Sequence, residues 1–178
     1  IYAHYLFPTG AIAAAAGRLM GRPWVITAHG GDVRNLQNPR VRALTAHSVR
    51  DAAAIVAVSN YLANELRASG LTLPPVHVAN MGVDLTRFQP SDRAAARSRL
   101  GLGPGPMVIA VGGLTERKNP LRLLQAFRQI RAVQPDATLA FVGDGPLAGS
   151  IRHGAARLDL QQAVLLPGAL PNTAIVDW

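Results

Sequence analysis

Residues 108–120 read Val108-Ile109-Ala110-Val111-Gly112-Gly113-Leu114-Thr115-Glu116-Arg117-Lys118-Asn119-Pro120. An apolar, largely β-branched run ends in two glycines, and a polar loop leads into a helix that begins at Pro120. A strand end, glycines and a helix N-terminus form an anion site, because free backbone N–H groups and the helix dipole point at the loop. Lys118 is the only lysine among the 18 Lys and Arg residues, and its compact ammonium suits a phosphate. The alternative is a lysine that is merely solvated.

The same alternation of apolar runs and helical patterns continues along the whole chain. We expect strands at residues 2–6, 24–28, 54–58, 76–79, 107–111, 138–142 and 163–166. We expect helices at residues 9–20, 39–52, 60–69, 92–100, 120–133, 147–158 and 172–178. Continuous apolar strands separated by helices predict parallel sheets covered on both faces, so the fold class is α/β, doubly wound.

The alternation is interrupted once, by the polar segment from Asp84 to Arg93, which contains Pro90. We therefore expect two Rossmann-like halves, residues 1–87 and 88–178. Ligands of such sheets bind at the carboxyl ends of the strands. The motifs described below fall at such ends, which predicts a site between the halves.

Composition narrows the classes of partner. The net charge is +8 and the pI about 11.4, but the arginines are scattered, and aromatic residues are only 5% of the chain. Nucleic acid is therefore not expected, whereas an anionic membrane surface or a nucleotide diphosphate fits the charge. The chain has no cysteine and no apolar run long enough to span a membrane. We expect a cytoplasmic protein, with peripheral attachment to the inner membrane face as an open alternative.

The first half carries His29-Gly30-Gly31-Asp32 at the end of an expected strand. A histidine beside glycines that let a ligand approach the backbone is a candidate site residue. The alternatives are a loop histidine for His29 and a helix N-cap for Asp32. Ser59, at the end of the next strand, is expected to cap a helix rather than to act as a nucleophile, because no histidine base lies near it in sequence.

The second half repeats the strand-to-glycine pattern at Phe141-Val142-Gly143-Asp144-Gly145-Pro146. These glycines could bring amides to a phosphate or a ribose, or they could simply form a tight turn. Neither glycine loop matches the dinucleotide fingerprint or the Walker P-loop. No spacing typical of metal ligands occurs, so we predict no metal site and no cofactor.

The order of these motifs resembles that of the family-4-type retaining glycosyltransferases, which have the GT-B fold. The matching segments are His29-Gly30-Gly31-Asp32, Val58-Ser59-Asn60, Asn80-Met81-Gly82-Val83-Asp84, Gly112-Gly113 with Lys118, Val142-Gly143-Asp144-Gly145, and Val164–Gly168. The six motifs lie in the family's order across nearly the whole chain.

The resemblance implies roles for particular residues. Lys118 would bind the donor's diphosphate with Gly112 and Gly113, and the turn of Gly143, Asp144 and Gly145 would border the nucleotide. The backbone of Leu166 and Gly168 would meet the base, and His29 would face the donor sugar at the reaction centre. Further site candidates are Gly10, Gly30, Asp32 and Ser59. The partners implied are a nucleotide sugar, which is the donor substrate, and a glycan or lipid-linked acceptor.

Two departures from the family pattern matter. The family usually has an arginine where this chain has Gly113, so the phosphate site is one charge weaker. The family's paired glutamates, which hold the donor, would follow Trp178, and its first strand would precede Ile1. We therefore expect a central fragment of an enzyme roughly twice this length, inactive by itself.

The resulting interpretation is a hexosyltransferase-type enzyme that transfers a sugar from a nucleotide-diphosphate donor with retention and without a metal. The alternative is a non-catalytic protein that binds sugar nucleotides, which Gly113 favours.

Overall fold

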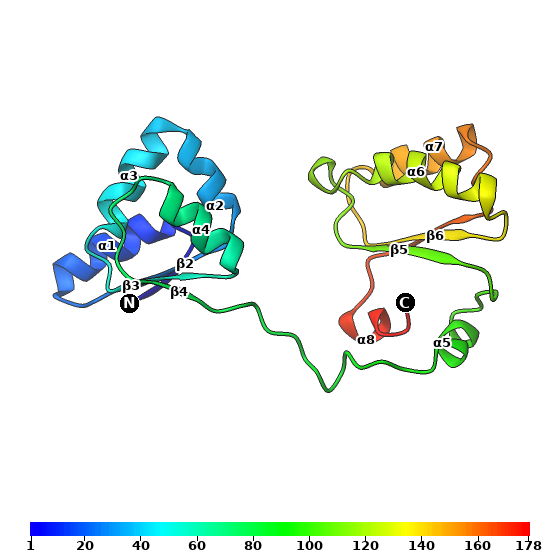
Figure 1. Cartoon of the computed structure of the whole chain (residues 1–178), viewed down its shortest axis with the longest axis horizontal. Helices are drawn as coiled ribbons and strands as arrows, with labels where there is room; N and C mark the ends of the chain where they lie inside the picture. Colours follow the sequence, from blue (N-terminus) through cyan, green and yellow to red (C-terminus); the bar gives the residue numbers. More distant parts are fainter. The chain divides into compact units, whose positions relative to one another are not determined.

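A computed structural model describes all residues, 1–178, and the chain forms two compact units, Ile1–Val83 and Asp84–Trp178. Each unit is a parallel sheet with helices in the connections, so the expected α/β class in two halves is confirmed (Figure 1). None of the helices is long and apolar enough to cross a membrane.

The first unit contains four strands and the helices that connect them. The strands are β1 (Tyr2–His4), β2 (Val25–Ala28), β3 (Ala54–Ala57) and β4 (Val76–Val78). The helices are α1 (Thr9–Met20), α2 (Gly31–Arg34), the 3-10 turn η1 (Asn35–Gln37), α3 (Pro39–Val49) and α4 (Asn60–Ala68). The strands lie in sequential order, β1-β2-β3-β4, and all pairs are parallel.

Sequential order places the connecting helices of this unit on one face, because crossovers between parallel strands share one hand. The helices of this unit lie over one face of the sheet (Figure 1). Ala3, Ile26 and Ile55, which are in register across β1, β2 and β3, are buried in one core with residues of α1 and α4. On the opposite face Tyr2 and His4 are exposed. The helices thus cover one face of this sheet, whereas the apolar strands predicted cover on both. On the other face Thr27 is still buried, and its hydroxyl is hydrogen-bonded to that of Tyr2.

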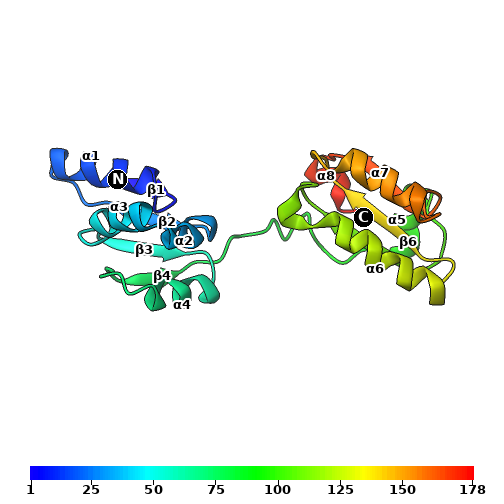
Figure 2. The same cartoon turned by 90° about the horizontal axis from the view of Figure 1, so that it is seen from above.

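The second unit contains three strands. They are β5 (Met107–Val111), β6 (Thr138–Val142) and β7 (Val164–Gly168), again parallel and in sequential order. The helices are α5 (Arg93–Arg99), the 3-10 turn η2 (Glu116–Lys118), α6 (Pro120–Val133), α7 (Ala148–Arg157) and α8 (Asn172–Ile175). Helices α6 and α7 lie side by side over one face, as Figure 2 shows from above, and α5 and α8 lie on the other face (Figure 1).

Strand β5 differs from the buried strand that its sequence predicts. Ile109 is 37% exposed and Val111 55% exposed. The reason is its place at the edge of the sheet, beside β6 only. The core of the unit lies instead around β6, where Phe141 packs with Leu124 and Phe127 of α6.

Candidate functional site

A glycine ends β7 and directly follows both β5 and β6, and hydrogen bonds join these strand ends. The Gly112 N–H donates to the Val142 carbonyl at 2.9 Å, and the Gly143 N–H donates to the Gly168 carbonyl at 2.9 Å. A further hydrogen bond joins the loop after β5 to the loop after β6: the Leu114 N–H donates to the Asp144 carbonyl at 3.0 Å. The structure therefore brings together the glycines that the sequence predicted as donor-binding.

Two of these glycines are required by the packing of one loop on the other. A Cβ atom on Gly143 would overlap with the carbonyl oxygen of Gly112. A Cβ atom on Gly145 would stand 2.7 Å from the carbonyl oxygen of Leu114. Loop contact alone thus accounts for both glycines, as the tight-turn interpretation allowed. Their proposed contact with the nucleotide stays a prediction.

Lys118 is the last residue of the turn η2, which the sequence pattern did not indicate. Its N–H donates to the Thr115 carbonyl at 3.0 Å, and Asn119 then adopts a left-handed conformation, with φ 50°, before α6 begins at Pro120. The side chain is exposed and forms no ion pair within the chain. The ammonium is therefore free to bind an anion near the start of a 14-residue helix.

Lys118 also lines a small cavity of about 130 Å³ with Gly112 and Gly113. The cavity reaches inward to Pro120 and Phe141. Gly113 is exposed, and a Cβ atom there would meet its nearest neighbours at 3.8 Å or more. A larger side chain therefore fits at this position, beside the lysine.

The remaining candidates of this unit lie around the same strand ends. The Asp144 carboxylate is exposed and accepts a hydrogen bond from the Gly145 N–H at 2.7 Å. Leu166 is partly buried against the core of the unit, and Gly168 ends β7 with φ 84°.

In the first unit, His29 directly follows β2, and the buried carboxylate of Asp32 fixes its backbone. Asp32 is 5% exposed, and its Oδ1 accepts from the His29 N–H at 3.0 Å. Its Oδ2 accepts from the Leu6 N–H, also at 3.0 Å. Asp32 is not the N-cap of α2, since Gly30 takes that position and Asp32 lies in the first turn. It instead ties the loop after β1 to the loop after β2.

The imidazole of His29 lies against two residues that the sequence analysis missed. His4 Nδ1 stands 2.8 Å from His29 Nε2, and the Tyr5 ring centroid lies 4.8 Å from that of His29. Both partners follow from strand order, because His4 ends β1 and β1 pairs with β2. Considering the neighbouring strand's carboxyl end would have pointed to them.

Gly10 supports this arrangement from α1. Tyr5 adopts φ 72°, in the left-handed region, and its carbonyl accepts from the Gly10 N–H at 3.0 Å. A Cβ atom on Gly10 would stand 3.1 Å from both that carbonyl oxygen and Ile26 Cδ1. Gly10 thus lets α1 pass close to the turn that carries Tyr5.

Ser59 caps α4, as expected, because its Oγ accepts from the Leu62 N–H at 3.2 Å.

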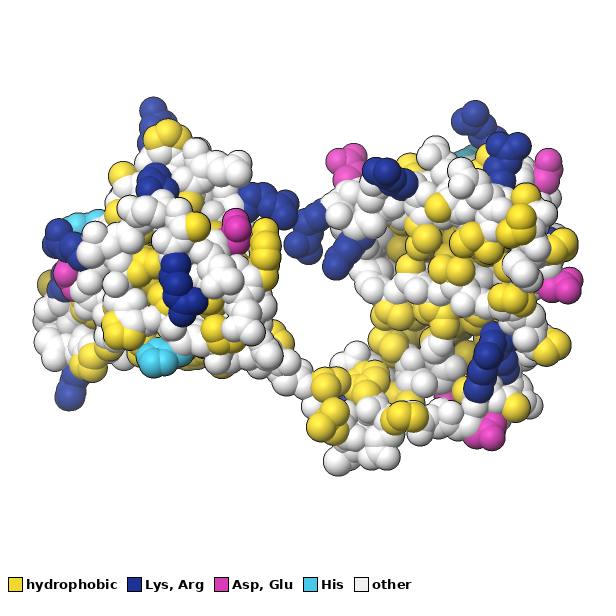
Figure 3. Space-filling view, in the orientation of Figure 1, with side chains coloured by type: hydrophobic (Ala, Val, Ile, Leu, Met, Phe, Trp, Pro, Cys, Tyr) yellow, Lys and Arg dark blue, Asp and Glu magenta, His cyan; other side chains and the backbone are white.

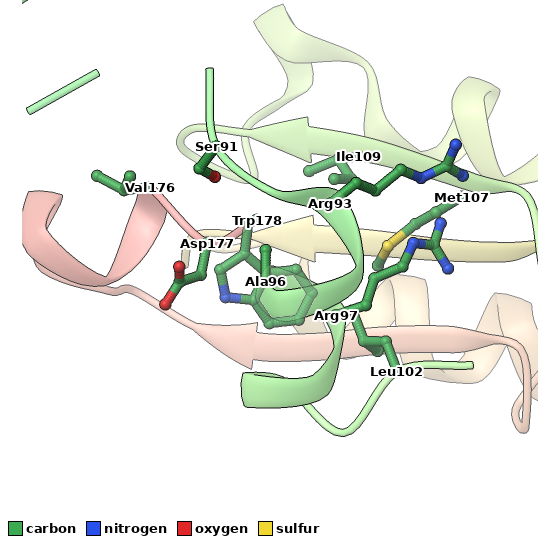
Figure 4. Close-up of a pocket in the computed structure, with 10 residues that line it drawn as sticks. All are labelled: Ser91, Arg93, Ala96, Arg97, Leu102, Met107, Ile109, Val176, Asp177 and Trp178. Carbon is green, nitrogen blue, oxygen red and sulfur yellow. The ribbon is translucent and has the colours of Figure 1, made fainter. Parts of the chain in front are cut away.

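A second, larger cavity lies on the α5 side of β5. It measures about 340 Å³ and is lined by Arg93 and Arg97 of α5, Met107 and Ile109 of β5, and Trp178 (Figure 4). Asp177, which also lines this cavity, forms an ion pair with Arg99, in which Nη2 and Oδ1 are 2.5 Å apart. The hydrogen bond from this guanidinium lowers the pKa of the Asp177 carboxyl. None of the predicted site residues lines this cavity.

Charge and ligand geometry give two further observations. In each unit taken by itself, Figure 3 shows Lys and Arg side chains at several separate places on the face drawn. Nowhere in the chain do three His, Asp or Glu side chains converge as metal ligands would.

Two family models together match nearly the whole chain. Glycosyltransferase Family 4 matches residues 1–87, and Glycosyl transferases group 1 matches residues 92–177.

Curated relatives agree with these matches. A GDP-mannose-dependent alpha-(1-6)-phosphatidylinositol monomannoside mannosyltransferase of Mycolicibacterium smegmatis is 29% identical over 92% of this chain. The putative teichuronic acid biosynthesis glycosyltransferase TuaC of Bacillus subtilis is 30% identical over all of it. In both cases the chain covers 44% of the relative, so it spans less than half of their length.

Solved structures share the fold. Sucrose-phosphate synthase of Thermosynechococcus elongatus has a TM-score of 0.82 at 21% identity, over 99% of this chain and 47% of that one. HepE of Anabaena, in complex with UDP, has a TM-score of 0.79 at 21% identity, over 93% and 47%.

Proposed function

Since this chain belongs to the family-4 glycosyltransferases, we propose that the whole protein transfers a sugar from a nucleotide-diphosphate donor to an acceptor with retention. The observation that carries the proposal is the cavity shared by Lys118, Gly112 and Gly113, beside the start of α6. An unpaired ammonium, glycine loops and a helix N-terminus suit a diphosphate.

In this proposal the leaving diphosphate is stabilised by fixed charges rather than by a metal. As the bond to the sugar breaks, negative charge grows on the phosphate, and Lys118, the loop amides and the dipole of α6 oppose it. His29 positions or polarises the donor sugar. No side chain of the site is assigned as a carboxylate nucleophile, so we do not propose the double displacement of retaining glycosidases.

A second function is favoured by one observation. Gly113 stands where the family usually has an arginine, so Lys118 is the only side-chain cation that lines the cavity. A protein of this kind could bind a sugar nucleotide without transferring the sugar.

The experiment that separates the two functions is a transfer assay. The whole protein is incubated with a panel of nucleotide sugars and candidate acceptors, with and without EDTA. We expect release of the nucleoside diphosphate with EDTA present, and NMR of the product to show the donor's anomeric configuration retained. Binding of a donor without any turnover would support the non-catalytic function. Loss of turnover in EDTA would contradict metal independence.

We also propose that the protein is cytoplasmic and binds the anionic surface of the membrane from that side. Its acceptor would then be linked to a lipid of this membrane. Helix α1 exposes Ile12, Leu19 and Met20, which are 65%, 88% and 66% exposed, and Arg22 follows the helix. Apolar side chains beside a cation are typical of a surface that lies on anionic lipid. Co-sedimentation with phosphatidylglycerol vesicles tests this, and we expect the double variant Leu19→Ser, Met20→Ser to sediment less. Equal sedimentation would contradict it.

A further inference from the structure

We propose that His4 is a positioning residue for His29: it holds Nε2 of His29 and leaves Nδ1 as the nitrogen that meets the sugar. The inference rests on the proposed function, because it requires His29 to lie at the donor sugar.

The geometry places the two rings in a defined pair. His4 ends β1, His29 follows β2, and the register of the two strands pairs His4 with Thr27. The nitrogen-to-nitrogen distance is 2.8 Å, and the ring planes are inclined by 37° with their centroids 5.1 Å apart. Tyr2 also contacts His4, edge to face with the ring centroids 4.9 Å apart, and the Tyr2 hydroxyl is hydrogen-bonded to Thr27 Oγ1 at 2.5 Å.

The hydrogen bond to His4 occupies one ring nitrogen of His29 and leaves the other one open. A neutral imidazole has one donor nitrogen and one acceptor nitrogen. Because Nε2 is committed to His4, only Nδ1 is open, and the structure gives it no partner within the chain. A sugar hydroxyl both donates and accepts, so it can pair with Nδ1 in either tautomer. His4 therefore sets which atom of His29 reaches the sugar and at what ring angle.

Other contacts hold the backbone of His29 without His4. The His29 N–H bonds Asp32, and the Tyr5 ring covers one side of the imidazole. Loss of the His4 nitrogen should thus free the ring to rotate while the loop keeps its place. This separates a positioning role from a structural one.

The chain offers matched variants. His4→Phe keeps an aromatic ring but removes both nitrogens, and His4→Asn returns a polar atom near the place of Nδ1. His77→Phe is the control, because His77 is an exposed histidine of β4 that forms no ring pair. In the whole protein we expect His4→Phe to lower kcat by about 10- to 100-fold, with the donor KM changed by less than about 3-fold. We expect His4→Asn to restore part of kcat and His77→Phe to leave it unchanged.

Ring NMR gives a readout that does not depend on turnover. With histidine labelled by 15N, long-range proton–nitrogen spectra of the whole protein should show the His29 Nε2 resonance shifted by its hydrogen bond to His4. In His4→Phe this resonance should move, because the hydrogen bond is lost. Unchanged His29 ring signals in His4→Phe, or full kcat in His4→Phe beside an inactive His29→Ala, would overturn this inference alone. A wild-type protein without any transfer would instead contradict the proposed function.

Discussion

Gly143 lies against the backbone of Gly112, with no room between them for a Cβ atom. This contact holds the loop after β6 on the loop after β5, next to the cavity that Lys118 lines. The loop after β5 therefore packs against a glycine that lies 31 positions further along the chain than Gly112.

The first prediction concerns this contact. Gly143→Ala should destabilise the second unit by about 1–3 kcal/mol, because the two loops must move apart to admit the methyl group. Urea unfolding measures the change. Gly149→Ala, at an exposed helical glycine with open space around its Cβ position, is the control and should not lower stability. Equal stabilities for the two variants would refute the contact.

A second prediction assigns Asp32 a structural role. Asp32→Ala leaves the N–H groups of Leu6 and His29 without their acceptor, which costs about 1–3 kcal/mol for a buried group. Glu65→Ala, at an exposed glutamate of α4 without an ion pair, should leave stability unchanged. A fully stable Asp32→Ala protein would show that the two loops do not need this carboxylate.

A third prediction concerns turnover. His29→Ala should lower kcat by about 100-fold or more while the melting temperature changes little, because the Asp32 contacts are made by backbone and remain. His47→Ala, at an exposed histidine of α3, should change neither quantity. An early melt with the residual rate intact would mean that His29 is structural.

The fourth prediction follows from the Arg99–Asp177 pair. The bond to Arg99 lowers the pKa of the Asp177 carboxyl below its ordinary 3.8. A lowered folded pKa contributes stability that is complete above 3.8 and is lost as the pH falls through the folded value. NMR titration should place the Asp177 midpoint below 3.8 in the wild type and closer to it in Arg99→Gln. An identical midpoint in both proteins would show that the pair is not formed in solution.

Much of the fold could be predicted because it depends on local patterns. The bounds expected for α1 and α6 agree with the structure, and the apolar residues Leu124 and Phe127 of α6 are buried. Gly70, just after α4, has φ 69°, the left-handed conformation typical of a glycine that ends a helix. Expected helices ended too late at residues 52 and 178, where α3 ends at Val49 and α8 at Ile175.

The site was less predictable, because its contacts join residues that are distant in sequence. The glycine motifs and His29 could be located at strand ends. The close approach of Gly143 to Gly112, which leaves no room for a Cβ atom, depends on the register of β5 and β6. The His4–His29 bond spans 25 positions and depends on β1 pairing with β2. The N-cap alternative for Asp32 was wrong, and its hydrogen bond to Leu6 could not be predicted because Leu6 lies in another loop.

The most direct test of the account is the affinity of the whole protein for nucleoside diphosphates, measured by calorimetry for the wild type and Lys118→Ala. Arg128→Ala, at an exposed cation elsewhere on α6, serves as the control, and Gly113→Arg should tighten binding. We expect Lys118→Ala to weaken binding by about 1.5–3 kcal/mol, the range for a charge-assisted hydrogen bond, and the control to bind as the wild type does. Unchanged affinity in Lys118→Ala would contradict the assignment of this loop to the donor diphosphate.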